Sequence, residues 1–511
     1  MKTWCILLAA CAHPGGGTGS VDSPGGAAVV DGAVSPDAAG VDAAPWHAHA
    51  DDATASLLLH FWSPSYLNDA SPSTGVATGY WTFAQAWDAV LDGAERTGGA
   101  KFAGWIEGLY LAQNARGWSS NFYDDENWMT LALVRAYDLA GDAKYLAEAK
   151  ALYADIEAAW DTTCCGATPG GIWWDRAHTQ KATASNAGPV IAGVRLAART
   201  GDASYLAFAK QVYAYWRAHM VDPTTYAVSD HEKPDGTVVT YRFTYNEGLV
   251  IGAAVALYGA TGTAQYLADA RGVAGYMLSA ETRDGILFDG DNTHCTGDCA
   301  QFKGIGYRYL SELQAIDPSP DLAAVLAASG QAVWTDARGS GNLFATDWAG
   351  PPATPTSIDA DSSAAMTLNL YAEALGAAPP PTDTRYQAED GVVHAIGLEA
   401  SHAGFAGWGY LAGWNGDGQW VDFHVHVAAA GTYTLTLGYA AGAGNASRLV
   451  YANGANAVPN LALPSTGSWD AWATQTARVA LPAGTSTISI IFNSSLGSSS
   501  YVNLDWITVA P

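Results

Sequence analysis

From residue 53 to residue 375, apolar side chains recur every three or four positions, a pattern that predicts a series of amphipathic helices. We expect helices over about 53–66, 79–94, 100–115, 126–140, 143–160, 184–199, 203–220, 245–260, 263–279, 300–315, 320–336 and 360–375. Several of them end in Gly-Asp or Thr-Gly and restart with Ala-x-Tyr-Leu, as at 141–146, 201–206 and 263–267. The Gly would stop one helix, and the Asp or Thr would cap the next one.

The copies of this punctuation are spaced by about one long helical hairpin. Helices in hairpins of this number predict an (α/α)6 barrel, in which six inner helices are surrounded by six outer ones. An open helical solenoid is the structural alternative. The unusual side chains lie in the connections, which we place after the inner helices.

After residue 376 the pattern changes. Residues 377–384 form a stiff Pro-rich spacer. Beyond it, apolar residues alternate with polar ones at 420–427, 433–437 and 487–492, and Gly-rich turns separate these runs. We therefore expect a multidomain chain, with an all-α barrel over 51–376 followed by an all-β jelly-roll sandwich over 385–511.

The start of the chain resembles an export signal. A charged residue and a short apolar run lead into Leu8-Ala9-Ala10-Cys11, and small residues before a Cys are typical of bacterial lipoprotein signals. Residues 1–11 would then be the signal peptide and lipobox. Cleavage before Cys11 would leave Cys11 as the lipidated first residue, and Cys5 would be lost with the signal. An ordinary signal peptide is the alternative. Residues 12–50 read as a flexible linker. We expect a protein exported to the bacterial cell surface, as an outer-membrane lipoprotein or in secreted form, that touches a membrane only through this lipid anchor.

The remaining cysteines are four in number, and an exported chain favours disulfides between them. Four cysteines allow three connectivities, between which the sequence does not choose: Cys164, Cys165, Cys295 and Cys299. The competing reading is a Zn site that uses Cys295, Cys299 and His294, but two adjacent cysteines fit a tetrahedral site badly.

Composition narrows the partners. The net charge of −26 excludes ordinary nucleic-acid binding, which needs basic patches, and fits an anionic membrane surface poorly. A neutral polysaccharide is compatible with it. The chain has 20 Trp and 25 Tyr, and their rings stack on sugars as well as filling cores.

The adjacent acids Asp124 and Asp125 are the main candidates for chemistry. Two neighbouring carboxylates can hydrolyse a glycosidic bond, one as nucleophile and one as acid. An ordinary helix cap with acidic residues in the first turn is the competing interpretation. Because neighbouring side chains diverge on a helix, we expect the pair in the turn before the helix.

Four motifs resemble glycoside hydrolase family 76, the endo-α-1,6-mannanases and related fungal wall transglycosidases. They are Tyr-Asp-Asp-Glu-Asn-Trp at 123–128, Gly-Gly-Ile-Trp-Trp at 170–174, Thr-Tyr-Asn-Glu-Gly at 244–248 and Phe-Lys-Gly-Ile at 302–305, within a resemblance that covers about 53–376. The resemblance implies an (α/α)6 barrel and retaining, endo-acting hydrolysis of α-1,6-mannan without a catalytic cofactor. Asp124 would be the nucleophile and Asp125 the general acid/base. The family has Gln where Glu247 stands, so a sugar contact or a local pKa would differ.

The residues expected to line the sugar subsites come from the same motifs: Trp128, Trp173, Trp174, Tyr245, Asn246 and Lys303. Each has a structural alternative, as a core aromatic, a helix cap or a surface cation.

The C-terminal region, 386–509, resembles the carbohydrate-binding modules of families 6 and 35. The similarity lies in Tyr-Gln-Ala-Glu at 386–389, Gly-Asp-Gly-Gln-Trp-Val at 416–421, Thr-Gly-Ser-Trp-Asp-Ala-Trp at 466–472 and Asn-Leu-Asp-Trp-Ile at 503–507. It implies a sandwich fold and sugar contacts from Tyr410 or Trp408, from Trp469 and from Asn503, with three further Trp in the core: Trp420, Trp472 and Trp506.

The same resemblance implies a structural Ca²⁺ held by Glu389 and Asp505, since hard oxygen ligands suit that ion. Gln387 stands where the family has an acid, which would weaken the site.

These observations predict a monomeric glycan hydrolase whose module holds the polymer near the barrel. Two alternatives stay open: a transglycosidase that uses a sugar as acceptor, and a non-catalytic glycan-binding surface protein.

Overall fold

The computed structural model describes residues 41–164, 169–289, 297–380 and 383–511. The signal sequence, most of the N-terminal linker, Cys165, His294 and Cys295 lie outside the described residues.

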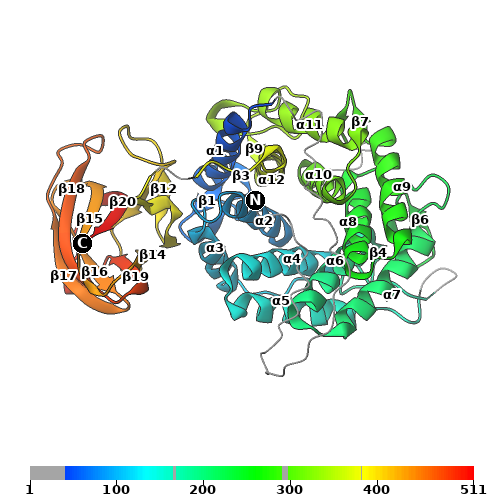
Figure 1. Ribbon diagram of the computed structural model, residues 1–511, viewed down its shortest axis with the longest axis horizontal. Coiled ribbons are helices and arrows are strands. Elements are labelled where there is room, and N and C mark those ends of the chain that lie inside the picture. The colour runs from blue at the N-terminus through cyan, green and yellow to red at the C-terminus, as the bar shows by residue number, and fades with distance from the viewer. Residues whose placement is uncertain (1–40, 165–168, 290–296, 381–382) are drawn as a thin grey trace, which may run out of the picture.

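Helices from two rings make up the N-terminal domain (Figure 1). In the inner ring each helix packs on the next and the last packs on the first: α2 (Tyr80–Arg96), α4 (Tyr123–Ala140), α6 (Thr183–Thr200), α8 (Thr244–Thr261), α10 (Cys299–Ile316) and α12 (Ile358–Leu375). The outer helices are α1 (Ala43–Phe61), α3 (Gly104–Asn114), α5 (Ala143–Ala158), α7 (Ala203–Met220), α9 (Ala264–Ala280) and α11 (Pro320–Thr335). Because the inner ring closes, the domain is an (α/α)6 barrel and the solenoid alternative is wrong.

The residues that end one helix and begin the next largely do so as their types predict. Gly141, Gly201 and Gly262 end their helices in the left-handed region, at φ of 71°, 73° and 66°. The carboxylates of Asp142 and Asp202 then accept hydrogen bonds from backbone N–H groups of the next helix. Thr263 occupies the N-cap position of α9, as predicted, but its side chain makes no cap bond.

Three further expectations need correction. The first helix begins at Ala43 and not at residue 53, since Asp42 caps it, so the linker cannot extend to residue 50. The sequence pattern missed the first turns of α1, residues 43–52, because they are rich in His and Asp. The unusual side chains do not follow the inner helices: those of 170–175 lie in the loop before α6, and those of 244–248 and 301–305 lie in the first turns of α8 and α10. The N-terminal ends of the inner helices meet at one mouth of the barrel. Finally, α4 begins at Tyr123, which places both acids inside the first helical turn.

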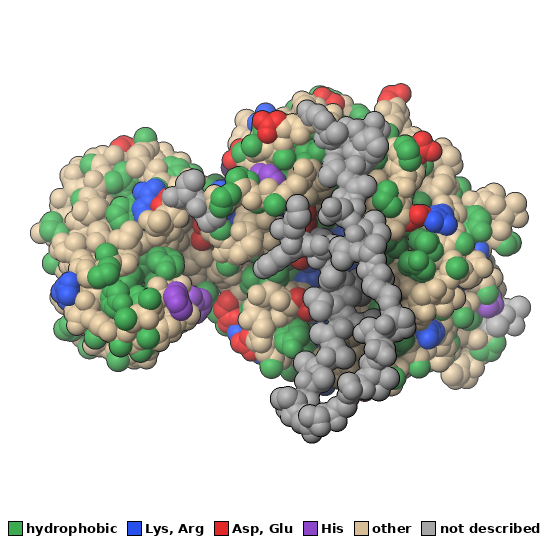
Figure 2. Space-filling model, in the orientation of Figure 1, with side chains coloured by type: hydrophobic (Ala, Val, Ile, Leu, Met, Phe, Trp, Pro, Cys, Tyr) green, Lys and Arg blue, Asp and Glu red, His purple; other side chains and the backbone are tan. Residues whose placement is uncertain are grey.

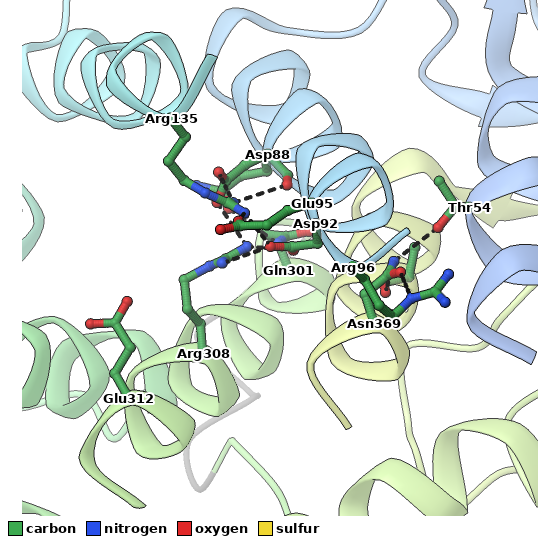
Figure 3. Close-up of polar contacts among 12 residues, drawn as sticks. Thr54, Asp88, Asp92, Glu95, Arg96, Arg135, Gln301, Arg308, Glu312 and Asn369 are labelled. Carbon is green, nitrogen blue, oxygen red and sulfur yellow. Dashed lines mark hydrogen bonds and ion pairs between the residues drawn. The ribbon is translucent and has the colours of Figure 1, made fainter. Parts of the chain in front are cut away.

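Buried ion pairs join the inner helices away from the mouth (Figure 3). Arg308 of α10 donates to both carboxylate oxygens of Asp92 on α2, at 2.9 and 2.6 Å. Arg135 of α4 donates to Asp92 at 2.7 Å and to Asp88 at 2.5 Å. Since a buried charge needs a partner, this cluster connects three of the six inner helices across the axis.

The C-terminal domain is a sandwich of two antiparallel sheets (Figure 1). One sheet has the order β12 (Gly397–Glu399), β13 (Tyr410–Trp414), β20 (Val502–Ala510), β15 (Gly431–Ala440) and β18 (Ala473–Leu481), with β10 (Tyr386–Gln387) also on β20. The other has the order β11 (Val392–His394), β14 (Trp420–Val427), β19 (Gly484–Ile491), β16 (Ala446–Ala452) and β17 (Ala455–Leu463). The alternating residues of β14 that face inward are buried, as the period of two predicts.

The sandwich lies directly against the barrel and meets it over a restricted area (Figure 2). Strand β11 packs on α3, and β12 packs on α1 and on β1 (Trp62–Ser63). None of the helices in the described ranges combines the length and apolarity needed to cross a bilayer.

Candidate active site

Two loops place Asp124 and Asp125 at the mouth of the barrel. The segment before α4 pairs with the segment before α6: Phe122 forms a bridge with Asp175, and Tyr123 N–H donates to the carbonyl of Trp174 at 2.8 Å. This pairing brings the Trp174 indole over the first turn of α4, where its Nε1–H donates to Asp124 Oδ2 at 2.9 Å.

The second acid has its own partner. Asp125 Oδ2 accepts a hydrogen bond from the Ser120 hydroxyl at 2.9 Å. The two carboxylates thus contact different loops, as the divergence of neighbouring helical side chains requires. Asp298, at the start of α10, lies close enough to raise the pKa of Asp125, and Asp124 lies close enough to raise that of Tyr245 on α8. Both acids therefore lie among the N-terminal ends of the inner helices, at the mouth of the barrel.

Burial raises the pKa of both acids. The pKa of Asp124 lies well above its ordinary value, because the group is buried and because Asp125 is negative; the Trp174 donor opposes this. Burial raises the pKa of Asp125 to about 7, against the stabilising bond from Ser120. Like charges this close do not ionise together, so the pair holds one proton near neutral pH.

A third acid, Glu126, braces the loop. It is fully buried, and its Oε1 accepts from Arg176 at 2.6 Å and from Ser120 N–H at 2.9 Å. Arg176 also lies over the ring of Tyr123, 4.9 Å from its centre. This ion pair fixes the loop whose Ser120 hydroxyl contacts Asp125.

The expected subsite residues divide into two groups. Trp174 and Tyr245 are half-buried at the mouth. The others are buried: Trp128 lies one turn below Asp124, against a cavity of about 10 Å³, which is about the space of one water. Trp173 stacks on His178 at 4.6 Å, and Lys303 lies 3.4 Å from Asp289. Trp173 is a buried aromatic, as its structural alternative predicts, whereas the surface-cation alternative is wrong for Lys303, which is buried beside Asp289. Contact of either residue with sugar stays a prediction.

Asp230, which the sequence reasoning missed, organises the remaining residues. Its Oδ1 accepts from the Tyr245 hydroxyl at 2.8 Å and from the buried Asn246 amide at 2.9 Å, and its Oδ2 contacts His231. Asp298 and Asp359 were missed too. The pKa of Asp359 is raised to about 7 by burial and by Asp298. Their position at the start of inner helices was the available signal.

Glu247 does not face a sugar. It is fully buried, accepts from Val228 N–H at 3.0 Å, and shares a hydrogen bond with Glu281. Burial raises its pKa to about 8, so this carboxyl is mainly protonated at neutral pH. The carboxyl group that replaces the family's Gln therefore has a strongly raised pKa of its own.

The disulfide expectation is confirmed for the described cysteines, since Cys164 and Cys299 are each disulfide-bonded. In the described parts of the chain, no group of three or more His, Cys, Asp or Glu side chains is arranged to hold a metal ion.

On the module, two expected sugar contacts need correction. Tyr410 is fully buried, with its hydroxyl bonded to Ser401 and Glu399, so its ring offers no face to a sugar. Trp408 turns toward the barrel, where its ring lies 5.5 Å from that of Phe102. Trp469 is half-buried and Asn503 is buried, and their contact with sugar stays a prediction.

A hollow of about 640 Å³ opens elsewhere on the module. Three aromatic rings line it, from Phe405, Trp472 and Trp506, together with polar groups of Arg385 and Thr474. Trp472 and Trp506 were expected in the core. They are instead half-buried and line this hollow beside groups that can form hydrogen bonds, a combination that suits sugar binding.

The expected Ca²⁺ ligands fit that ion. Glu389 is fully buried, and its Oε2 has no hydrogen-bond partner; the same is true of the buried Gln387 Oε1. Asp505 is 3% exposed and close enough to raise the pKa of Glu389. Unsatisfied buried oxygens beside two carboxylates suit a hard cation, which would relieve both the repulsion and the desolvation.

Comparison with known proteins agrees with this geometry. Residues 46–383 match the model of glycosyl hydrolase family 76, and residues 387–511 match that of carbohydrate binding module family 6. The structure of the GH76A alpha-1,6-mannanase from Salegentibacter sp. is 25% identical, with a TM-score of 0.59, and the match covers 64% of this chain and 99% of that one.

Two curated relatives match in part. The mannan endo-1,6-alpha-mannosidase DCW1 of Candida glabrata is 28% identical over 258 residues, which is 45% of this chain and 55% of that protein. An isomaltosyltransferase of Sporosarcina globispora is 43% identical over 126 residues, which is 24% of this chain and 11% of that protein. The chain thus spans about half the length, or less, of these curated relatives.

Proposed function

Because this chain belongs to glycosyl hydrolase family 76 and ends in a family 6 carbohydrate binding module, we propose that it is a retaining glycoside hydrolase that cuts α-1,6-linked mannan within the polymer. The observation that carries the proposal is the acid pair at the barrel mouth, one member bonded to the Trp174 indole and the other with a pKa of about 7. The names of the Salegentibacter and Candida proteins supply the substrate class.

The two acids receive different roles from their surroundings. Burial and the charge of Asp125 raise the pKa of Asp124, and the Trp174 N–H and the N-terminal end of α4 oppose this rise. We assign Asp124 as the nucleophile because these donors stabilise its charged form. We assign the proton of the pair to Asp125, whose pKa of about 7 suits a group that acts first as an acid and then as a base.

In the first step, Asp124 bonds to the anomeric carbon as the glycosidic C–O bond breaks, and Asp125 transfers its proton to the leaving oxygen. In the second step, Asp125 takes a proton from water, whose oxygen bonds to the anomeric carbon and releases Asp124. Retention follows because two displacements occur at one carbon.

We further propose that the module binds the polymer in the hollow between Phe405, Trp472 and Trp506. A pyranose ring has an apolar face that packs on an aromatic side chain, and Thr474 supplies a hydrogen-bonding group. Because a polysaccharide of this kind lies outside cells, we also propose that the chain acts after export, which agrees with its disulfides.

A substrate screen tests the catalytic proposal. The purified full chain should release oligosaccharides from α-1,6-mannan and not from other α-mannans or β-glucans. Release from none of them would favour the non-catalytic alternative. Products longer than the starting oligosaccharide, formed when a mannose acceptor is added, would favour the transglycosidase.

A further inference from the structure

The segment 387–391 contributes both to the candidate cation site of the module and to the contact between the module and the barrel. The side chain of Glu389 belongs to the candidate cation site, where its Oε1 accepts from the backbone N–H of Trp408 at 2.8 Å and its Oε2 is unsatisfied. The backbone carbonyl of the same residue accepts a hydrogen bond from the indole of Trp105, which lies on α3 of the barrel, at 2.8 Å.

The next residue extends this contact. Asp390 Oδ1 accepts from the backbone N–H of Phe102 at 2.8 Å and from the indole of Trp408 at 3.0 Å. Phe102 and Trp105 are both fully buried, although they belong to a surface helix and the loop before it. The module therefore supplies hydrogen-bond acceptors and covers apolar side chains that the barrel would otherwise expose.

The backbones of the barrel and the module come closest at two glycines, Gly104 and Gly391. A Cβ on Gly104, the first residue of α3, would lie 2.2 Å from the carbonyl carbon and oxygen of Gly391. Neither backbone can yield without separating the surfaces. A second contact lies beside it, where Trp62 donates to the carbonyl of Ile396 at 3.0 Å.

We propose that binding of a divalent cation between Gln387, Glu389 and Asp505 and docking of the module onto α3 are thermodynamically linked. The cation would hold Glu389 in the position in which its carbonyl meets Trp105 and Asp390 meets Phe102. Without it, the buried oxygens Glu389 Oε2 and Gln387 Oε1 have no partner, which favours a rearrangement of the segment that breaks the docking contacts.

The same linkage fixes the hollow relative to the barrel mouth. Asp505 lines that hollow and accepts from the backbone N–H of Ala406, another lining residue. Cation site, docking surface and hollow are therefore one connected unit, so an ion would set the orientation in which the module presents a glycan.

Linkage is reciprocal, which provides a sharp test: a barrel substitution that blocks docking must weaken cation binding in the module. Gly104→Ala and Gly108→Ala make the same change one turn apart on α3, with the same direction of change in helix propensity. The added Cβ at Gly108 would meet only an ordinary contact, 3.6 Å from Trp105, whereas that at Gly104 collides with backbone.

We expect calorimetric titration of the full chain with CaCl₂ to give a Kd about tenfold weaker for Gly104→Ala than for Gly108→Ala, which should match the wild type. Small-angle scattering in CaCl₂ should show a larger radius of gyration for Gly104→Ala alone. Equal affinities in the two variants, or no Ca²⁺ binding by the wild type, would overturn the linkage.

A second pair tests the opposite direction and does not depend on α3. Glu389→Gln removes a cation ligand, and Asp417→Asn changes an exposed carboxylate that bonds only Ser494 among the described contacts. In CaCl₂, hydrogen exchange in the peptide containing Phe102 and Trp105 should accelerate in Glu389→Gln and not in Asp417→Asn. Chelation by EGTA should accelerate it in the wild type. Unchanged exchange after chelation would contradict the proposal.

Discussion

Replacing Trp174 by Phe removes one hydrogen-bond donor from the acid pair and keeps an aromatic ring beside Phe122, from which the indole now lies 4.6 Å away. A hydrogen bond to a charged group contributes about 1.5–3 kcal/mol. Since one pKa unit corresponds to about 1.4 kcal/mol, the pKa of Asp124 should rise by about 1–2 units.

The consequence is a shift in the pH dependence of turnover. Asp124 must be ionised to attack the anomeric carbon, so the acidic limb of kcat/KM against pH should move upward by about 1–2 units. Below that limb the rate should fall about 10–100-fold relative to the wild type, since each unit is a factor of ten.

The assay is the initial rate of reducing-end release from α-1,6-mannan across the acidic and neutral pH range. Trp173→Phe is the matched control, because that indole stacks on His178 and lies near Lys181, with no bond to either acid. The reasoning is refuted if the limb stays in place in Trp174→Phe, or if Trp173→Phe moves it equally.

Three further predictions concern stability and binding. Arg308→Met should lower the free energy of unfolding in urea by about 3–5 kcal/mol, because Asp92 keeps a buried charge that Arg135 alone cannot balance. The control, Arg199→Met, breaks an exposed pair with Asp138 and should cost about 0–1 kcal/mol. A similar loss in both variants would contradict the role of the cluster. Glu247 binds a proton more tightly in the folded state, because its pKa is raised to about 8. Its contribution to the free energy of unfolding is therefore complete below the ordinary Glu pKa and is lost as the pH rises toward about 8. Glu247→Gln should flatten the fall in Tm over that window, and an unchanged slope would argue against this reasoning. Trp472→Ala should abolish retention of the full chain on immobilised mannan while the rate on short oligosaccharides is kept, whereas normal retention would move the binding surface away from the hollow.

Much of the barrel could be predicted because its signals are local. Gly141 and Asp142 stop one helix and cap the next through bonds within a few residues, and such signals are readable in any window of the sequence. The helix start at Ala43 was missed because His47 is buried through a bond with Arg96, which lies in another helix. A polar residue that is satisfied at long range looks like a linker residue in the sequence.

The acid pair and the neighbouring Trp174 and Tyr245 were recognisable, but the further acids around them were not. Asp298 and Asp230 lie far along the chain from Asp124, and only closure of the inner ring brings them together. Glu247 shows the same limit: a polar residue at a helix start is equally compatible with a sugar contact and with the buried pair that it forms with Glu281.

The module shows why aromatic residues were the least predictable. Alternation along a strand tells which residues share a face, but not whether another segment covers that face. Tyr410 is covered by the segment around Ser401, and Trp408 by the barrel, whereas Trp472 and Trp506 remain at an open surface.

The central claim is that Asp124 and Asp125 hydrolyse α-1,6-mannan in two displacements. Proton NMR of the first products formed by the wild-type chain tests it most directly, with Asp124→Asn and Asp125→Asn beside it. The account predicts that the new reducing end appears first as the α-anomer and that neither folded variant forms product at an appreciable rate. A β-anomer as first product, or near-normal turnover by either variant, would contradict it.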